Sequence, residues 1–385
     1  GADCPASLTS GEFKVSYQDT KHLRACLRPY TRRDNVKAMV IFMGDMLLYA
    51  AAVAGILYFE STVVKLVLGI VAGMLVSSIF VIAHDAAHDS FTTSKTLNKV
   101  IARVTYLLSL HNYSLWLTAH NRVHHQVTNI RDMNSWSPLD RDEYQGLSAS
   151  RKLLQRIYRT PPGMCLYYMI ERWWKYKCYP FKSIAGKYNA VYLDFMSIVT
   201  YLAAYAGLLV YAGLGMATVG PVQALVFGLF VPFLVWNFMM GFTVYQHHTH
   251  EDIAWTRDRE ESREMGGQVD YTMHVRYPRW YNLISHNIME HTAHHVDPRI
   301  PCYNLGNAQK QLAGLIGPAM HAVDFSLREF LRTMANCKLY DYENHCWLDF
   351  SGRRTSRPVM ASVREPVLRA AFFFFKQKTA YEITV

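Results

Sequence analysis

Four long apolar segments constrain the fold of this chain more than any other feature. They lie at residues 38–59, 66–83, 195–215 and 221–246, and the last three contain no charged residue. About 18 or more consecutive apolar residues can cross the hydrocarbon core of a bilayer as a helix. We therefore predict an all-α integral membrane protein with four transmembrane helices. The alternative is a soluble all-α core.

The connecting segments predict how these helices are arranged. Only "ESTVVK" separates the first two segments, and a few uncharged residues separate the last two. The N-terminal segment, the region 84–190 and everything after 247 hold nearly all of the Lys and Arg. Because cytoplasmic loops carry an excess of these residues, we expect two hairpins and a cytoplasmic helical cap. The net charge of +10 suits contact with anionic lipids, and no pattern indicates nucleic-acid binding.

Three clusters of histidine lie in the polar regions after these helices. The motifs "HDAAHDSF", "HNRVHH" and the "HTAHH" that ends "HNIMEHTAHH" contain eight of the 17 histidines, namely His84, His88, His120, His124, His125, His291, His294 and His295. Residues three or four apart on a helix share a face, so each cluster can direct its imidazoles into one site. Neutral imidazole binds iron, zinc, copper or nickel. Eight ligands exceed the four of a structural zinc site and suit two neighbouring metal ions.

A histidine-rich metal transporter is the non-enzyme alternative. Transporters place polar ligands near the middle of the bilayer on broken helices. Here the clusters follow the ends of the apolar segments, which favours a metal centre at the membrane surface.

The three clusters, in this order, resemble the three histidine boxes of the integral-membrane fatty acid desaturases. The flanks "HDAAHDSF", "HNRVHHQVTN", "YQHHTHEDIAW" and "HNIMEHTAHHVDPRIPCYNL" resemble the acyl-lipid omega-6 (delta-12) branch, over about residues 30–345. Related membrane hydroxylases or ketolases that act on alkanes or carotenoids share the boxes. The R-I-P-x-Y extension after the third box favours the acyl-chain branch.

The resemblance implies an enzyme that introduces a cis double bond into an acyl chain. It implies two non-haem iron ions, O2 as co-substrate and two electrons, with no catalytic residue beyond the metal centre. The eight box histidines match the iron ligands of the family. A ninth nitrogen ligand is expected just after the last apolar segment, where we choose His248 over His250 and His247.

Other groups near the boxes receive secondary roles. Five carboxylates are expected to orient imidazoles or to be solvated: Asp85, Asp89, Asp132, Glu290 and Asp297. The chain has no haem-binding His-Pro-Gly-Gly segment and no dinucleotide fingerprint after a strand, so we expect a separate electron donor of the ferredoxin or cytochrome b5 type. The acyl substrate is expected to be linked to a lipid or to a thioester carrier.

We expect residues 1–371 to form a single domain. The tail 372–385, "FFFFKQKTAYEITV", has a different expected origin. Its residues match the translation of a thymine run followed by a common sequencing adapter, so we expect it to be non-native.

Overall fold

The structure is a computed structural model that describes residues 17–117, 128–181, 189–317 and 320–359. Within these residues, four helical runs are long and apolar enough to cross a membrane: α2 (Asn35–Tyr58), α3 (Thr62–Ala87), α10 (Asn189–Gly215) and the run 221–248. The last run consists of α11 (Pro221–Leu225), the π-helical turn η4 (Val226–Phe230) and α12 (Val231–His248). The prediction of four membrane-length helices is confirmed.

These helices extend beyond the predicted apolar segments. α3 begins four residues before residue 66 and continues to Ala87, and α10 begins at Asn189 rather than at 195. Capping fixes two of the starts, because the side chains of Asp34 and Ser61 accept hydrogen bonds from first-turn N–H groups of α2 and α3. Apolar composition marks the part of a helix that suits hydrocarbon, whereas caps mark where the helix begins.

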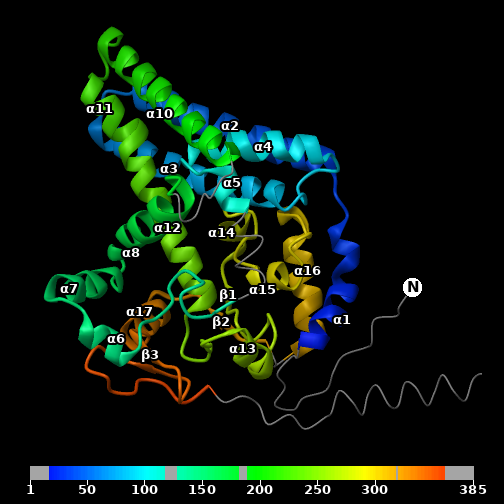
Figure 1. Ribbon diagram of the computed structural model, residues 1–385. Helices are drawn as coiled ribbons and strands as arrows, with labels where there is room; N and C mark the ends of the chain where they lie inside the picture. The colour runs from blue at the N-terminus through cyan, green and yellow to red at the C-terminus, as the bar shows by residue number, and fades with distance from the viewer. Residues whose placement is uncertain (1–16, 118–127, 182–188, 318–319, 360–385) are drawn as a thin grey trace, which may run out of the picture.

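α3 lies at the centre of the helical bundle and packs against α2, α12 and α4 (Lys95–Leu108) (Figure 1). A Cβ atom at Gly73 would lie 2.8 Å from the carbonyl oxygen of Pro232 and 2.6 Å from Cβ of Val235. Only glycine permits so close an approach of α3 to α12. The C-terminal ends of these two helices carry His84 and His248.

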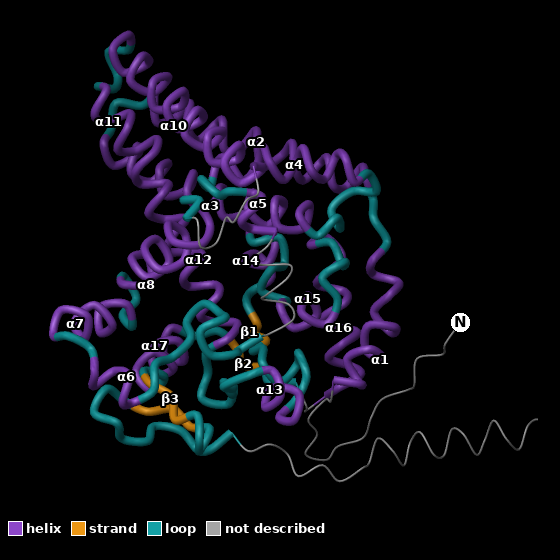
Figure 2. Tube along the Cα trace, in the orientation of Figure 1, coloured by secondary structure: helices purple, strands orange, loops and turns teal. Residues whose placement is uncertain are grey.

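Shorter elements lie around those C-terminal ends (Figure 2). Before α10 they are α1 (Tyr17–Leu27), η1 (Arg28–Thr31), α5 (Tyr113–Trp116), α6 (Arg141–Gly146), α7 (Ala149–Tyr158), α8 (Gly163–Tyr167) and the π-helix η3 (Tyr168–Cys178). After α12 they are α13 (Arg259–Met265), β1 (His274–Arg276), α14 (Arg279–Ile284), α15 (His291–Val296), α16 (Cys302–Ile316), β2 (Ala322–Asp324), α17 (Leu327–Asn336), β3 (Leu339–Asp341) and β4 (Cys346–Leu348).

Two small sheets depart from the predicted all-α fold. β1 pairs with β2 in parallel, with His274 opposite Ala322, and β3 pairs with β4 antiparallel, with Leu339 opposite Leu348. Each strand has three residues, which is too short for an alternating pattern to predict. The fold is therefore mostly helical rather than wholly helical.

Two charged residues inside the long helices have polar partners. Asp45 of α2 lies 2.6 Å from Nε2 of His286, which belongs to the segment between α14 and α15. Lys65 in the first turn of α3 is 1% exposed, and its ammonium donates to the carbonyl oxygen of Thr218 and to Oε1 of Gln223. Such pairing is expected for charged groups in membrane helices. The predicted non-native tail at 372–385 lies outside the described residues.

Candidate metal centre and cavity

His84, His88 and His294 form the first of two histidine clusters. His84 lies in the last turn of α3, His88 directly follows that helix, and His294 lies in α15. One nitrogen of each lies within 4.8 Å of the others. The spacing of four residues brings His84 and His88 to the same side of α3, and the ring centroid of His84 lies 4.6 Å from that of His294.

His248, His291 and His295 form the second cluster, and all three are buried. His248 is the last residue of α12, and the other two lie one turn apart on α15. Nε2 of His291 lies 3.2 Å from Nε2 of His248 and 3.0 Å from Nε2 of His295. Three ring nitrogens therefore converge on one point.

Hydrogen bonds on the outer side of two rings decide which nitrogen faces this point. Nδ1 of His248 donates to the carbonyl oxygen of Tyr271 at 3.1 Å, and Nδ1 of His295 donates to Oε1 of Gln268 at 3.0 Å. Both rings therefore present an Nε2 lone pair toward His291. A proton on Nε2 of His291 could form a hydrogen bond with only one of these two lone pairs. With metal–nitrogen bonds of about 2.1 Å, adjacent ligands lie about 3 Å apart, so this donor set fits a metal ion.

α15 links the two clusters, because this one short helix supplies residues to both. His291 and His295 lie four residues apart and share the second cluster, whereas His294 belongs to the first. Burial, followed by the neighbouring His247 and the cluster histidines, lowers the pKa of His291 well below its ordinary value. The imidazole is therefore neutral at physiological pH, which is the form that binds metal.

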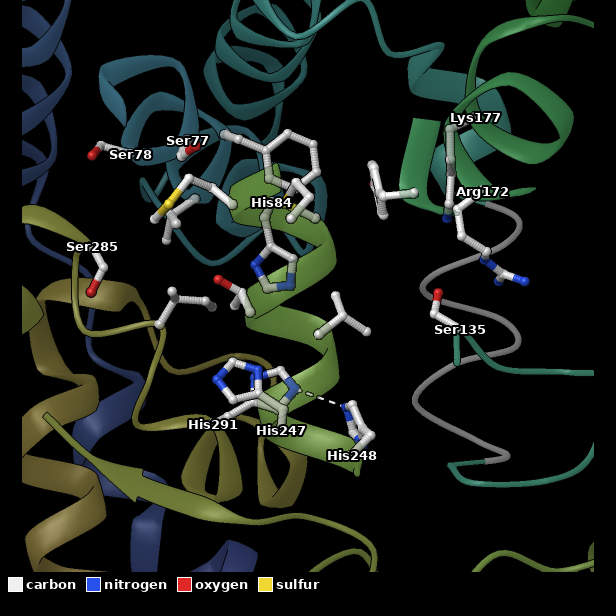
Figure 3. Close-up of a pocket in the computed structure, with 18 of the residues that line it drawn as sticks. Ser77, Ser78, His84, Ser135, Arg172, Lys177, His247, His248, Ser285 and His291 are labelled. Carbon is white, nitrogen blue, oxygen red and sulfur yellow. Dashed lines mark hydrogen bonds between the residues drawn. The ribbon is translucent and has the colours of Figure 1, made fainter. Parts of the chain in front are cut away.

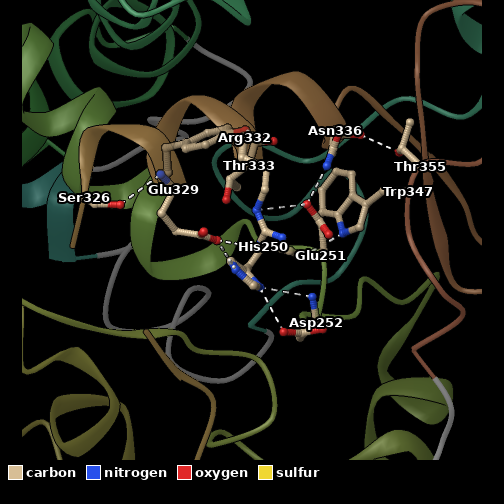
Figure 4. Close-up of polar contacts among 11 residues, drawn as sticks. His250, Glu251, Asp252, Ser326, Glu329, Arg332, Thr333, Asn336, Trp347 and Thr355 are labelled. Carbon is tan, nitrogen blue, oxygen red and sulfur yellow. Dashed lines mark hydrogen bonds and ion pairs between the residues drawn. The ribbon is translucent and has the colours of Figure 1, made fainter. Parts of the chain in front are cut away.

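The other candidate histidines have different positions. His120, His124 and His125 lie outside the described residues. The ring of His247 stacks on that of His291, with centroids 3.8 Å apart. His250 joins a separate polar network at α17, where Nε2 lies 3.3 Å from Oε1 of Glu329 (Figure 4). Of the three alternatives for a ninth ligand, His248 is the one whose nitrogen the structure groups with two box histidines.

The five candidate carboxylates also differ. Asp85 accepts a hydrogen bond from Nδ1 of His84 at 3.1 Å, which is the expected orienting role. Glu290 lies 2.7 Å from His274 instead, and Asp297 pairs with an arginine. Asp89 and Asp132 lie at turns with left-handed backbone.

A cavity lies beside both clusters, between α3, α12 and α14 (Figure 3). His84 of the first cluster and His291 of the second both line it, together with apolar side chains such as Met74, Val81 and Met240. No aspartate or glutamate is among the described residues that line it. The arrangement can hold an apolar chain against two adjacent metal sites.

Sequence reasoning missed several residues of this site. Gln268 and Tyr271 orient cluster histidines from 27 and 23 residues away in the chain, and no local motif marks them. Arg172 and Lys177 line the cavity from η3. Their position depends on a π-helix, which the sequence pattern does not reveal.

The fold and the site together define a membrane protein with two histidine clusters that could each hold a metal ion, beside an apolar cavity. Comparison with known proteins then gives its family, because a profile described as fatty acid desaturase matches residues 61–325. The chain belongs to the fatty acid desaturase family, which confirms the resemblance seen in the histidine boxes.

Similar proteins from plants and cyanobacteria carry related names. The chain is 28% identical over 273 residues to the chloroplastic omega-6 fatty acid desaturase of Glycine max, covering 70% of this chain and 61% of that protein. It is 26% identical over 286 residues to the sn-1 oleoyl-lipid 12-desaturase of a Picosynechococcus species, covering 72% and 77%. It is 27% identical over 298 residues to an endoplasmic-reticulum omega-3 desaturase of Vigna radiata, covering 74% of each. The chain thus spans about three fifths of the length of the plant omega-6 relative.

Proposed function

We propose that this protein is a desaturase that introduces a cis double bond into a fatty acyl chain, at the delta-12 (omega-6) position. The observation that carries the proposal is the apolar cavity, which histidines of both clusters line. Family membership supports the reaction class. The names of the omega-6 and oleoyl-lipid 12-desaturase relatives support the double-bond position.

We place two iron ions at the clusters. His84, His88 and His294 would hold one, and His248, His291 and His295 the other, with His120, His124 and His125 completing the set. Bound iron would supply the oxidising power, drawn from O2 and two electrons, that no amino-acid side chain can supply for an unactivated methylene. The chain itself keeps the imidazole of His291 neutral, and it fixes the direction of the neighbouring rings through Asp85, Tyr271 and Gln268.

The cavity residues would position the substrate. Apolar walls from α3 and α12 exclude water from the reacting carbons and give an extended acyl chain contact along its length. His84 and His291 mark the part of this path where hydrogens would be removed. Burial of five of the six cluster histidines, all except His88, protects the same region from solvent.

The membrane arrangement and the electron donor complete the proposal. Two hairpins would place the histidine clusters and the shorter elements on the cytoplasmic side, as the Lys and Arg distribution favours. A separate ferredoxin or cytochrome b5-type protein would deliver electrons there, guided by the basic charge of the chain.

Expression in cells whose lipids contain only saturated and monounsaturated acyl chains tests this proposal. Fatty acids from those cells should contain an 18-carbon diene with double bonds at carbons 9 and 12, identified by mass spectrometry of derivatives that fix double-bond positions. His294→Ala is the matched inactive control, because His294 belongs to the first cluster. Hydroxylated or keto products in place of the diene would contradict desaturation and indicate one of the related oxidative reactions. Metal uptake by these cells without any change in lipids would indicate a transporter.

A further inference from the structure

One end of the cavity carries two positively charged side chains that the proposed chemistry does not use. Arg172 and Lys177 both line the cavity and both belong to the π-helix η3. In a π-helix the hydrogen bonds join residues five apart, which brings such residues to neighbouring positions on one side. Arg172 and Lys177 are five apart, so this helix type directs both cations into the same space (Figure 3).

Lys177 is the more deeply buried of the two cations. It is 7% exposed, and its ammonium lies 4.2 Å from the centre of the Trp116 ring. Burial, and then the nearby charge of Arg172, lowers the pKa of Lys177 well below its ordinary value. No salt bridge to either cation occurs in the part of the chain that the structure describes, and the neighbouring segment 118–127 contains no acidic residue. Two unneutralised cations inside a cavity are costly unless an anion joins them.

Arg172 adds an unsatisfied donor at the same end of the cavity. Its guanidinium stacks on Tyr176 at 4.9 Å, and its Nε is buried with no hydrogen-bond partner among the described residues. A planar guanidinium and an ammonium together match the oxygens of a phosphate. Trp116 lies between this end and the histidines, because its ring is 6.1 Å from that of His84.

From this geometry we propose that Arg172 and Lys177 bind the phosphate-bearing head of the acyl substrate. This inference rests on the proposed desaturase function. The acyl chain then extends from this end of the cavity past His84 and His291. The head is held at a fixed place, so the double bond forms at a set distance from the carboxyl end of the chain. A phosphate at this position also stabilises the charged form of Lys177. Both a glycerophospholipid and a coenzyme A thioester offer this phosphate chemistry.

Lipid binding to the purified protein in detergent, measured by native mass spectrometry, tests the subsite without requiring turnover. The probes are dioleoyl phosphatidylglycerol, oleoyl coenzyme A and uncharged dioleoyl monogalactosylglycerol. Wild type should bind at least one phosphate-bearing probe about ten-fold or more tightly than the galactolipid, since hydrogen bonds to charged groups contribute about 1.5–3 kcal/mol each. The phosphate-bearing probe that is preferred identifies the carrier.

Arg172→Met with Lys177→Met should remove this preference while galactolipid binding stays within about two-fold. Lys177→Met alone, which keeps an apolar stem over Trp116, should lose most of it, and Lys177→Arg should retain it. Lys175→Met is the matched control, because Lys175 lies on the same helix but pairs with Glu171 at the surface. Equal binding of all three probes by wild type, or an unchanged preference in Lys177→Met, would overturn the subsite. Loss of diene formation with the preference intact would instead contradict the desaturase proposal alone.

Discussion

His111 shows how a single buried histidine outside the clusters supports the cavity wall. Its Nδ1 donates to the carbonyl oxygen of Ser109 at 3.0 Å, and its Nε2 accepts from the hydroxyl of Tyr168 at 3.2 Å. Tyr168 lines the cavity. Burial lowers the pKa of His111 to about 3, so the ring stays neutral and can accept this hydrogen bond.

This burial predicts an acid-sensitive fold. An unfolded histidine gains a proton near pH 6.5, whereas folded His111 does not until about pH 3. Its contribution to stability is therefore complete above pH 6.5 and is lost as the pH falls below that value, by up to about 1.4 kcal/mol per pH unit. Thermal unfolding in detergent between pH 7.5 and 5 should show a steeper loss in wild type than in His111→Gln. Equal slopes in the two proteins would contradict the assignment.

The residue scale also shows where sequence patterns stop being informative. Spacing on helices predicts the pairs His84–His88 and His291–His295, whose members lie four residues apart. It does not predict that His294 joins the cluster of the first box. The choice between His248 and His250 is different. α12 ends at His248, and Thr249 is extended with φ of −128°, so the helical rule no longer applies to His250. The backbone conformation at the end of α12 therefore separates His248 from His250. That conformation depends on tertiary contacts, which the sequence pattern does not show.

At the scale of elements, one polar contact joins a membrane helix to the segment that leads into α15. Asp45 and His286 are separated by 241 residues and meet at 2.6 Å, with side chains only 12% and 13% exposed. Ser78 of α3 holds the start of this segment by donating to the carbonyl oxygen of Ile284, the last residue of α14. The segment therefore links two long helices to the helix that carries His291 and His294.

We expect Asp45 and His286 to be energetically coupled. Asp45→Ala and His286→Ala should each lower the melting temperature in detergent, because removing one partner of a buried pair costs about 3–5 kcal/mol. The double variant should lose about as much stability as the worse single variant, so the coupling should be about 3 kcal/mol or more. Strictly additive losses would show that the contact does not join the two elements.

At the scale of the whole molecule, the four long helices were predictable because each needs only an uninterrupted apolar segment. The shorter elements around the histidines were not. α13 has seven residues, α15 has six and each strand has three, so none carries a pattern long enough to read. Their positions come from tertiary packing, such as that of α15 against α16 and of β1 against α12, which only the folded chain defines.

The proposed arrangement of the four long helices in two hairpins predicts which side of the membrane each connecting segment occupies. Protease added to inside-out membrane vesicles reaches the cytoplasmic face of the membrane. An epitope inserted near Gly215, in the connection between α10 and α11, should be protected from it. An epitope near Arg141 should be accessible to it, because positively charged segments stay in the cytoplasm. Equal accessibility of both epitopes from the cytoplasm would rule out four spans in two hairpins.

We propose that the two histidine clusters hold a pair of iron ions beside the apolar cavity. Metal analysis of the purified protein, expressed with ample iron, tests it most directly. Wild type should contain about two iron atoms per chain, one for each histidine cluster. His248→Ala should lose iron, whereas His250→Ala should retain it because His250 belongs to the network at Glu329. A wild-type protein with zinc in place of iron, or with one metal per chain, would contradict the account, as would equal iron loss in the two variants.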